Sequence, residues 1–237
     1  MDKQNISQME LLEEHIKTLF VLDSQSKMVS INEPWDKTKP APRLYIGKTI
    51  DGTIIYKSGY DVSLIKIKEI EKILFKESMN NKFEYLEEYL KIMESKNYGE
   101  EMCYYYNNIK EDTINNCEII CKKINEDNIT DFTLDRFEWL KDEINYCQPC
   151  YGIINNGNII SVCRSVRITE KAHQAGIETI KEYRGKGFAG KVLIKWANDI
   201  LNKSCIPFYS TSKENKASQR VAEKMELKIF GIGISVK

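Results

Sequence analysis

The stretch Ala175-Gly-Ile-Glu-Thr-Ile-Lys-Glu-Tyr-Arg-Gly-Lys-Gly-Phe-Ala-Gly190 combines a strand, a polar turn, a glycine-rich loop and the start of a helix. Side chains alternate over residues 175–180, which predicts a strand with Ile177 and Thr179 on one face and Glu178 on the other. Apolar side chains then recur every three or four residues to about residue 203, which predicts a helix with one buried stripe. An order of strand, loop and helix indicates an α/β fold.

The loop Arg184-Gly-Lys-Gly-Phe-Ala189 has the composition of an anion site. The first turn of a helix presents unpaired N–H groups and partial positive charge, and glycines let the backbone approach an anion closely. Arg184, Lys186 and Lys191 add positive charge around the same point. The loop therefore predicts a phosphate site, and the alternative is a basic turn that only connects strand to helix.

Two known phosphate motifs fit this loop poorly. Residues 185–190 match the Gly-x-Gly-x-x-Gly pattern of dinucleotide sites, but four residues separate them from the strand and no acidic residue ends the next strand. The ATP-binding P-loop needs Ser or Thr after Gly-Lys, and Val192 follows Lys191. A nicotinamide-cofactor protein is therefore disfavoured.

A third pattern fits better. Arg184-x-x-Gly187-x-Ala189 resembles the pyrophosphate loop of the GNAT acyltransferase superfamily, written Arg/Gln-x-x-Gly-x-Gly/Ala. A strand at 206–211 follows, and then Asn215 with the small residue Ser218 opens another helix, as in the second cofactor element of that family. The order of elements over residues 150–237 resembles the whole acyl-CoA-binding half, and several N-terminal segments look like a bacterial branch of the superfamily.

The resemblance implies a fold, a cosubstrate and a reaction. The fold is α/β (α+β), with a GNAT-like mixed central sheet flanked by helices and an N-terminal α+β extension. Acetyl-CoA is the expected cosubstrate, and the expected function is direct transfer of its acetyl group to an amine in a ternary complex. The expected cofactor-binding residues are Ile177, Thr179, Arg184, Gly185, Lys186, Gly187, Phe188, Ala189 and Asn215. The alternative function is a non-catalytic acyl-CoA-binding or regulatory module.

Glu178 and Ser218 are the candidate catalytic residues. In the resembled family the strand before the loop often carries a glutamate that deprotonates the amine, and burial would raise the pKa of Glu178 toward the useful range. The alternative for Glu178 is a salt bridge to Arg164 or Arg167. The family often has a Tyr proton donor seven residues after the Asn, where this chain has Ala222. Ser218, Ser210 or a water is then the candidate acid, or the thiolate leaves unassisted.

The amino-acid composition argues against two classes of partner, nucleic acid and anionic membranes. The 237-residue chain has 35 basic and 35 acidic side chains, so nothing predicts bulk attraction to nucleic acid or to an anionic membrane. We find neither an apolar run long enough to span a bilayer nor a secretory signal, and seven cysteines are too few for a disulfide scaffold. We expect a cytoplasmic monomer or homodimer that acts on a small-molecule or peptide amine without a metal.

Two domains are expected, with the boundary at the polar segment 125–128. Residues 1–125 form an N-terminal α+β region that packs on the acceptor side, and residues 126–237 form the acetyl-CoA-binding domain. Hairpins are predicted at Asp51-Gly52 and at Asn156-Gly157. Helices are expected over residues 6–17, 62–76, 82–94 and 133–146. Strands are also expected at 102–106 and 117–122, joined by a polar loop over 107–116, and at 229–236.

The remaining reactive side chains favour structural roles. Cys147-x-x-Cys150 lacks the second ligand pair of a metal site and lies in a helix-to-strand connection. His15 is expected on the first helix and His173 in a loop, and neither has a Ser or Cys nucleophile nearby in sequence.

Overall fold

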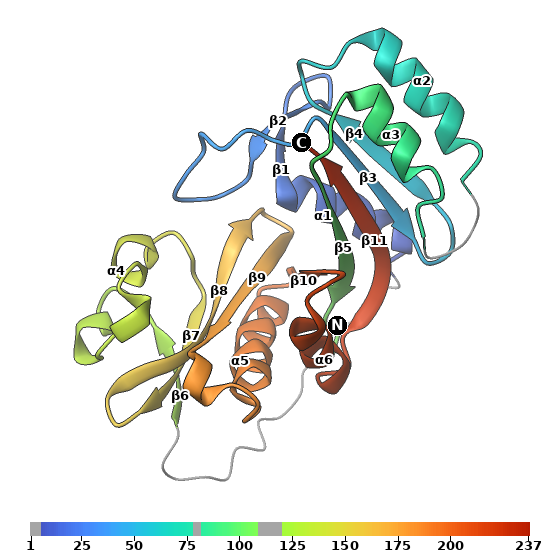
Figure 1. Ribbon diagram of the computed structural model, residues 1–237. Coiled ribbons are helices and arrows are strands. Elements are labelled where there is room, and N and C mark those ends of the chain that lie inside the picture. The colour runs from blue at the N-terminus through green and yellow to red at the C-terminus, as the bar shows by residue number, and fades with distance from the viewer. Residues whose placement is uncertain (1–5, 78–81, 109–119) are drawn as a thin grey trace.

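The strands of this protein form one large mixed sheet and one small hairpin. The computed structural model describes residues 6–77, 82–108 and 120–237. Within them, nine strands pair in the order β4-β3-β11-β5-β10-β9-β8-β7-β6, and β1 pairs with β2 separately (Figure 1). The strands are β1 (Phe20–Leu22), β2 (Met28–Ile31), β3 (Leu44–Thr49), β4 (Ile54–Ser58), β5 (Tyr98–Tyr105), β6 (Ile120–Ile124), β7 (Cys150–Asn155), β8 (Asn158–Ile168), β9 (Ala172–Thr179), β10 (Ile206–Ser212) and β11 (Lys228–Val236).

Helices cover both faces of the large sheet. They are α1 (Gln8–Leu19), α2 (Leu64–Leu74), α3 (Leu86–Met93), α4 (Leu140–Glu143), α5 (Phe188–Asn202) and α6 (Lys216–Lys224). α1 contacts β3, β9 and β11 on one face, and α5 packs against β7, β8 and β9 on the other. α2 and α3 lie together beside β3 and β4 (Figure 1). The predicted fold class, a mixed sheet flanked by helices, is confirmed.

Local sequence signals set several boundaries of these elements. Ser7 and Glu10 form a capping box at the start of α1, in which each side chain accepts a hydrogen bond from the backbone N–H of the other. The predicted hairpins are confirmed, because β3 pairs with β4 across Asp51-Gly52 and β7 pairs with β8 across Asn156-Gly157. Gly52 and Gly157 both have positive φ, which a glycine adopts without strain.

The predicted helix over residues 133–146 is mostly wrong. The segment contains a 3₁₀ turn at Asp135–Phe137 and only the four-residue α4. Thr133 is bound to the sheet, since its N–H donates to the carbonyl oxygen of Gly157 and its carbonyl oxygen accepts from the N–H of Ile159. Asp135 then has φ of 44°, which interrupts any helix. Three apolar side chains of the segment, Phe137, Leu140 and Ile144, are nevertheless buried.

The large sheet interleaves the two ends of the chain. β5 lies between β10 and β11, although it precedes them by more than a third of the sequence. β11 in turn lies between β5 and β3, so C-terminal and N-terminal strands alternate. The sheet is therefore continuous across the boundary expected near residue 125. Most of the loop expected over residues 107–116, and the first residues of the strand expected at 117–122, lie outside the described residues.

Candidate functional site

The glycine-rich loop lies between β9 and α5, as the sequence predicted. A 3₁₀ turn at Lys181–Tyr183 follows β9, and Gly187 is the N-cap of α5. Gly185 and Gly187 have φ of 79° and 83°, which other L-residues rarely adopt. A Cβ atom at either position would meet no other atom within 4 Å. The loop therefore combines a backbone path that favours glycine with open space above it.

The start of α5 has free backbone donors. No side chain caps this helix, and among the described residues the N–H groups of Phe188 and Ala189 have no hydrogen-bond acceptor. The positive end of a 15-residue helix thus points its N–H groups at the space beside the two glycines. This arrangement can bind a phosphate group without any side chain.

The basic side chains of the loop have distinct surroundings. Arg184 is exposed, and its Nε donates to the carbonyl oxygen of Thr179 at 3.0 Å. Lys186 Nζ lies 5.0 Å from the ring centre of Tyr183, and Lys191 Nζ lies 5.9 Å from that of Phe188. Arg184 therefore fastens the loop to the strand, while the two lysines remain near the helix start.

The third glycine of the loop has a packing role. A Cβ atom on Gly190 would lie 2.6 Å from the sulfur of Met225, which follows α6. Gly190 thus allows α5 and the end of α6 to approach closely. The last glycine of the Gly-x-Gly-x-x-Gly pattern therefore has a packing reason in this protein.

β9 and β10 separate next to this loop. They pair in parallel only from Ala172 with Ile206 to Gln174 with Phe208. Beyond that point β9 pairs only with β8, and β10 pairs only with β5. The facing edges of the two strands, including the backbone of Ile177 and Thr179, therefore offer N–H and C=O groups without a strand partner. An extended ligand could pair with such an edge.

α6 begins as predicted. Asn215 is its N-cap, and the side-chain oxygen accepts from the N–H of Ser218 at 3.1 Å. The hydroxyl of Tyr209 on β10 donates to the carbonyl oxygen of Ser218 at 3.2 Å. Burial raises the pKa of Tyr209, so this hydroxyl stays protonated at neutral pH. Ala222, at the position of the expected tyrosine, is fully buried.

Glu178 differs from the sequence-based expectation in two ways. Its side chain is exposed on the face of β9 opposite α5, so the expected burial is wrong. The alternative ion pairs are wrong as well, because Arg164 pairs with Glu143 at 3.1 Å and Arg167 pairs with Glu33 at 3.7 Å. In the described part of the chain, Glu178 has no ion pair.

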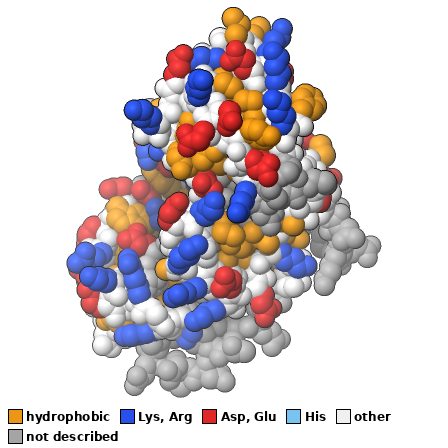
Figure 2. All heavy atoms as spheres, turned by 45° about the vertical axis from the view of Figure 1, so that its right-hand side comes forward, with side chains coloured by type: hydrophobic (Ala, Val, Ile, Leu, Met, Phe, Trp, Pro, Cys, Tyr) orange, Lys and Arg blue, Asp and Glu red, His pale blue; other side chains and the backbone are white. Residues whose placement is uncertain are grey.

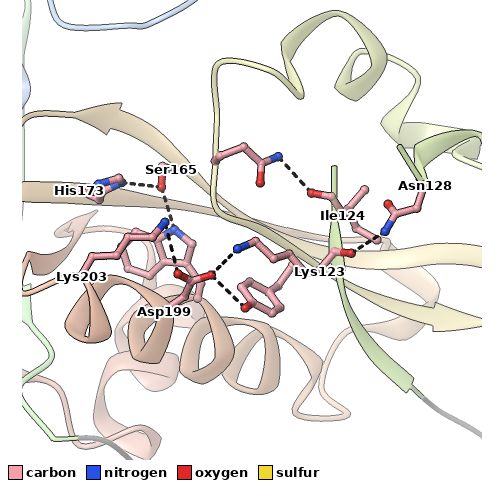
Figure 3. Close-up of polar contacts among 10 residues, drawn as sticks. Lys123, Ile124, Asn128, Ser165, His173, Asp199 and Lys203 are labelled. Atoms are coloured by element: carbon pink, nitrogen blue, oxygen red, sulfur yellow. Dashed lines mark hydrogen bonds and ion pairs between the residues drawn. The ribbon is translucent and has the colours of Figure 1, made fainter. Parts of the chain in front are cut away.

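A polar network holds α5 against the sheet (Figure 3). Asp199 accepts from Lys123 at 2.7 Å and from Tyr151 at 3.1 Å, and it also pairs with Lys203. Trp196 Nε1 donates to Ser165 Oγ at 3.0 Å, and Ser165 lies 2.9 Å from Nδ1 of His173. These contacts connect α5 with β6, β7, β8 and β9, and so fix the helix whose first turn forms the loop.

His173 lies within β9, so its expected position in a loop was wrong. Burial is the main cause that lowers its pKa to about 4, so the imidazole is neutral at pH 7. The neighbouring Ser165 is fully buried and already accepts from the Trp196 indole, which favours a structural pair over a nucleophile and base. Cys147 and Cys150 are also fully buried.

A cavity of about 750 Å³ opens on the α1 face of the sheet. Its walls include Phe20, Met28, Pro42 and Tyr45, and its lining also contains Arg167 and the β10 residues Ser210, Thr211 and Ser212. Since these β10 residues follow the last β9–β10 pair, the cavity adjoins the point where the two strands separate.

Glu101 on β5 reaches this cavity. Its Oε1 accepts from the hydroxyl of Tyr45 at 2.9 Å and lies 3.5 Å from Nε2 of the buried His15. Burial acts to raise the pKa of Glu101, but His15, Ser210 and Tyr45 outweigh it and lower the pKa below its usual range. Sequence reasoning missed Glu101 because the strand was predicted to begin at residue 102, whereas β5 begins at Tyr98 and so contains Glu101.

Glu101, His15 and Cys103 could together hold a metal ion, because their ligand atoms lie within 4.8 Å of one another. Burial raises the pKa of the Cys103 thiol well above its ordinary value. A metal ion bound there would have to displace the thiol proton, since metals bind the thiolate.

Comparison with protein families gives one decisive match. The sequence model of the GNAT acetyltransferase family matches residues 62–228, which include the loop, both separating strands and the start of α6. The chain belongs to the GNAT acetyltransferase family. No curated protein is significantly similar in sequence. Across residues 6–77, 82–108 and 120–237, no helix has the length and apolarity of a membrane span.

Solved structures with similar folds are distant in sequence. A GCN5-related N-acetyltransferase-like protein from Streptococcus suis is 13% identical, with 85% of this chain and 86% of that chain aligned and a TM-score of 0.48. A GNAT-family acetyltransferase from Colwellia psychrerythraea is 14% identical, with 77% and 76% aligned and a TM-score of 0.47. A GNAT-family structure from Novosphingobium aromaticivorans is 13% identical, with 60% and 65% aligned and a TM-score of 0.46. The chain thus spans slightly less than two thirds of this last structure.

Proposed function

We propose that this protein is an N-acetyltransferase that moves the acetyl group of acetyl-CoA to an amine by direct transfer in a ternary complex. The observation that carries the proposal is the uncapped start of α5 beside two glycines with positive φ, next to the unpaired edge of β9. A chain of phosphates followed by an extended amide arm has the chemistry to occupy both features. Family membership supports the same reading.

Different residues would bind different parts of acetyl-CoA. Backbone N–H groups from Gly185 to Ala189 would bind the pyrophosphate, with Lys186 supplying charge. Backbone groups at Ile177 and Thr179 would align the pantetheine arm as an added strand, and one N–H of β9 would polarise the thioester carbonyl. Asn215 would hold α6 beside the arm.

The reaction needs one proton acceptor and one proton donor. The amine loses a proton to water or to Glu178, and its nitrogen attacks the thioester carbon. The new N–C bond forms as the C–S bond breaks, and coenzyme A leaves as a thiol after taking up a proton. Because Ala222 has no hydroxyl, that proton would come from Ser218, Ser210 or a water. Holding both reactants side by side supplies much of the rate.

The N-terminal region would shape the acceptor side of this site. β1, β2 and the segment before β3 line the cavity on the α1 face, and β5 contributes Glu101 to it. A small molecule or a peptide side chain is the proposed acceptor.

A non-catalytic acyl-CoA-binding module is the second candidate, and the buried Ala222 in place of a tyrosine favours it. Calorimetry with acetyl-CoA, coenzyme A and NAD separates the ligand classes. Thiol release with a panel of primary amines then separates an enzyme from a binding module. Tight acetyl-CoA binding without turnover of any amine would favour the module, and NAD binding alone would contradict both candidates.

A further inference from the structure

The imidazole of His15, on α1, is fully buried between apolar rings. The rings of Phe208 and Phe230 pack edge-on against it, with centroids 5.1 and 5.5 Å away. Within the described residues, neither Nδ1 nor Nε2 of His15 has a hydrogen-bond partner. Burying an unpaired polar group costs free energy, and an ion bound to such a group offsets that cost.

Two further donor side chains lie around the same point. Glu101 and Cys103 are two residues apart on β5, so their side chains share one face of the strand. Together with His15 they bring one nitrogen, one oxygen and one sulfur atom within 4.8 Å of one another. Nε2 of His15 lies 3.5 Å from Oε1 of Glu101. A helix and a strand from separate parts of the chain thus contribute three kinds of metal ligand to one cluster.

The spacing of these atoms suits a tetrahedral zinc ion. Bonds of about 2.1 Å place nitrogen and oxygen ligands about 3.4 Å apart, and a Zn–S bond of about 2.3 Å places sulfur about 3.6 Å from either. The contact between His15 and Glu101 is close to that length. The widest pair of the cluster would have to close by at most about 1 Å.

Tyr45 and Gly233 support the carboxylate of this cluster. The Tyr45 hydroxyl donates to Oε1 of Glu101 at 2.9 Å. Gly233 lies opposite Glu101 in the sheet, and a Cβ atom there would lie 2.5 Å from the Tyr45 hydroxyl and 3.0 Å from Oε1 of Glu101. The glycine therefore makes room for this hydrogen bond. Hydrogen bonds of this kind orient the ligands of a metal and strengthen its binding.

The charges of the cluster match those of a divalent ion. A neutral imidazole, one carboxylate and one thiolate together cancel the charge of Zn²⁺. Arg167 lines the cavity beside Glu101 and interacts with its charge, while its own ion pair is with Glu33 at 3.7 Å. A loaded site without net charge does not repel this guanidinium. On binding, the S–H bond of Cys103 breaks, a Zn–S bond forms and one proton passes to the solvent.

We propose that His15, Glu101 and Cys103 form a zinc site that fastens α1 to β5. Mixed nitrogen, oxygen and sulfur ligands suit Zn²⁺, whereas Mg²⁺ and Ca²⁺ prefer oxygen alone. Three protein ligands leave one position for a water, and Glu101 also lines the cavity on the α1 face, from which water can enter. The site goes beyond the proposed acyl transfer, because its ion links two elements of the fold and takes no part in that reaction.

Metal loading of the full chain tests this site. The protein is stripped with a chelator, loaded with Zn²⁺ or Co²⁺ and desalted. The wild type should retain about one equivalent of Zn²⁺ by elemental analysis, and its melting temperature should rise on loading, because the ion binds only the folded protein. The Co²⁺ form should show the thiolate-to-cobalt charge-transfer absorption, which a site without sulfur does not give.

Two variants each remove one ligand and nearly keep its size. Cys103→Ser and Glu101→Gln should weaken Zn²⁺ binding at least about 100-fold, because loss of an outer partner alone costs roughly 10- to 100-fold. Cys103→Ser should also lose the charge-transfer absorption. Cys163→Ser is the matched control, since Cys163 is equally buried but lies on β8, and it should keep both properties. Circular dichroism verifies each fold, and if one ligand variant does not fold, the other decides.

Three results would overturn the inference. The first is a wild type that retains no more Zn²⁺ than the folded Cys103→Ser variant. The second is an unchanged Zn²⁺ affinity in a folded Glu101→Gln variant. The third is a charge-transfer absorption that survives in Cys103→Ser and is lost when Cys147 and Cys150 are both replaced by serine, since the metal would then bind at that pair.

Discussion

Nε of Arg184 donates a hydrogen bond to the carbonyl oxygen of Thr179 at 3.0 Å, so the first residue of the glycine-rich loop is fastened to the last residue of β9. The guanidinium thereby links the end of the unpaired strand edge to the loop that leads into α5. A single ligand that contacts both features needs the distance between them to be constant.

Arg184→Lys should therefore weaken acetyl-CoA binding about 3- to 10-fold, although the net charge is unchanged. Lysine has no equivalent of Nε and cannot bond Thr179 in the same geometry. Calorimetry measures the change, and Arg136→Lys, an exposed site distant in sequence, is the control. Equal affinities for the Arg184 and Arg136 variants would show that only charge matters at the loop.

Gly187→Asp should abolish acetyl-CoA binding, because it adds a side chain and a negative charge where a phosphate would lie. Gly157→Asp is a matched control, since Gly157 also has positive φ and a Cβ there would likewise meet nothing within 4 Å. Calorimetry on both variants separates backbone strain from loss of the site. Comparable acetyl-CoA binding by the two folded variants would remove the loop from the cofactor site.

Asn215→Ala should cost about 1 kcal/mol of unfolding free energy, because α6 loses its N-cap. If α6 also positions the cofactor arm, the Michaelis constant for acetyl-CoA should rise as well. Ser63→Ala removes the cap of α2 and serves as the control, with a similar loss of stability and no kinetic effect. A Michaelis constant that stays constant in both variants would leave Asn215 with the capping role alone.

Glu178→Gln tests the proposed base. Loss of a general base typically costs about 10²- to 10⁴-fold in turnover, with partial recovery at high pH as free amine accumulates. Since Glu178 is exposed and has no ion pair in the described residues, the melting temperature should change by less than about 2 °C. Wild-type turnover in this variant would assign deprotonation to water.

The pH dependence of stability should contain a contribution from His173. Its pKa is about 4 in the folded protein and near 6.5 in the unfolded chain, so the unfolded chain binds more protons between these values. Stability from this group is therefore present above pH 6.5 and is lost as the pH falls toward 4, with a slope of at most about 1.4 kcal/mol per pH unit. His173→Asn should flatten this part of the curve in denaturant titrations, and an unchanged slope would contradict the assignment.

One exposed face carries charges of both signs. Figure 2 shows basic and acidic side chains on both the upper and the lower part of one face. Apolar side chains are exposed on α2, at Leu64 and Ile65.

The sequence by itself determined the local features of the proposed cofactor site. The two loop glycines, the cap at Asn215 and both hairpin turns follow from conformational preferences of neighbouring residues, and the structure has each where the pattern predicted it. The helix predicted over residues 133–146 failed because backbone hydrogen bonds bind Thr133 to the β8 turn, a contact outside the local pattern. The prediction that Glu178 is buried was wrong for a related reason. Alternation along a strand predicts which face a side chain lies on, but it does not predict whether another element covers that face.

Only the tertiary structure decided which residues meet in the cavity on the α1 face. Glu101 lines this cavity because β5 pairs with β10 and β11 from the far end of the chain. That pairing sets Gly233 opposite Glu101, and packing of α1 on the same face adds His15. Such contacts depend on the register between strands that are distant in the sequence, and short-range periodicity does not encode that register. Turns and helix caps, in contrast, depend on residues that are close together in the sequence.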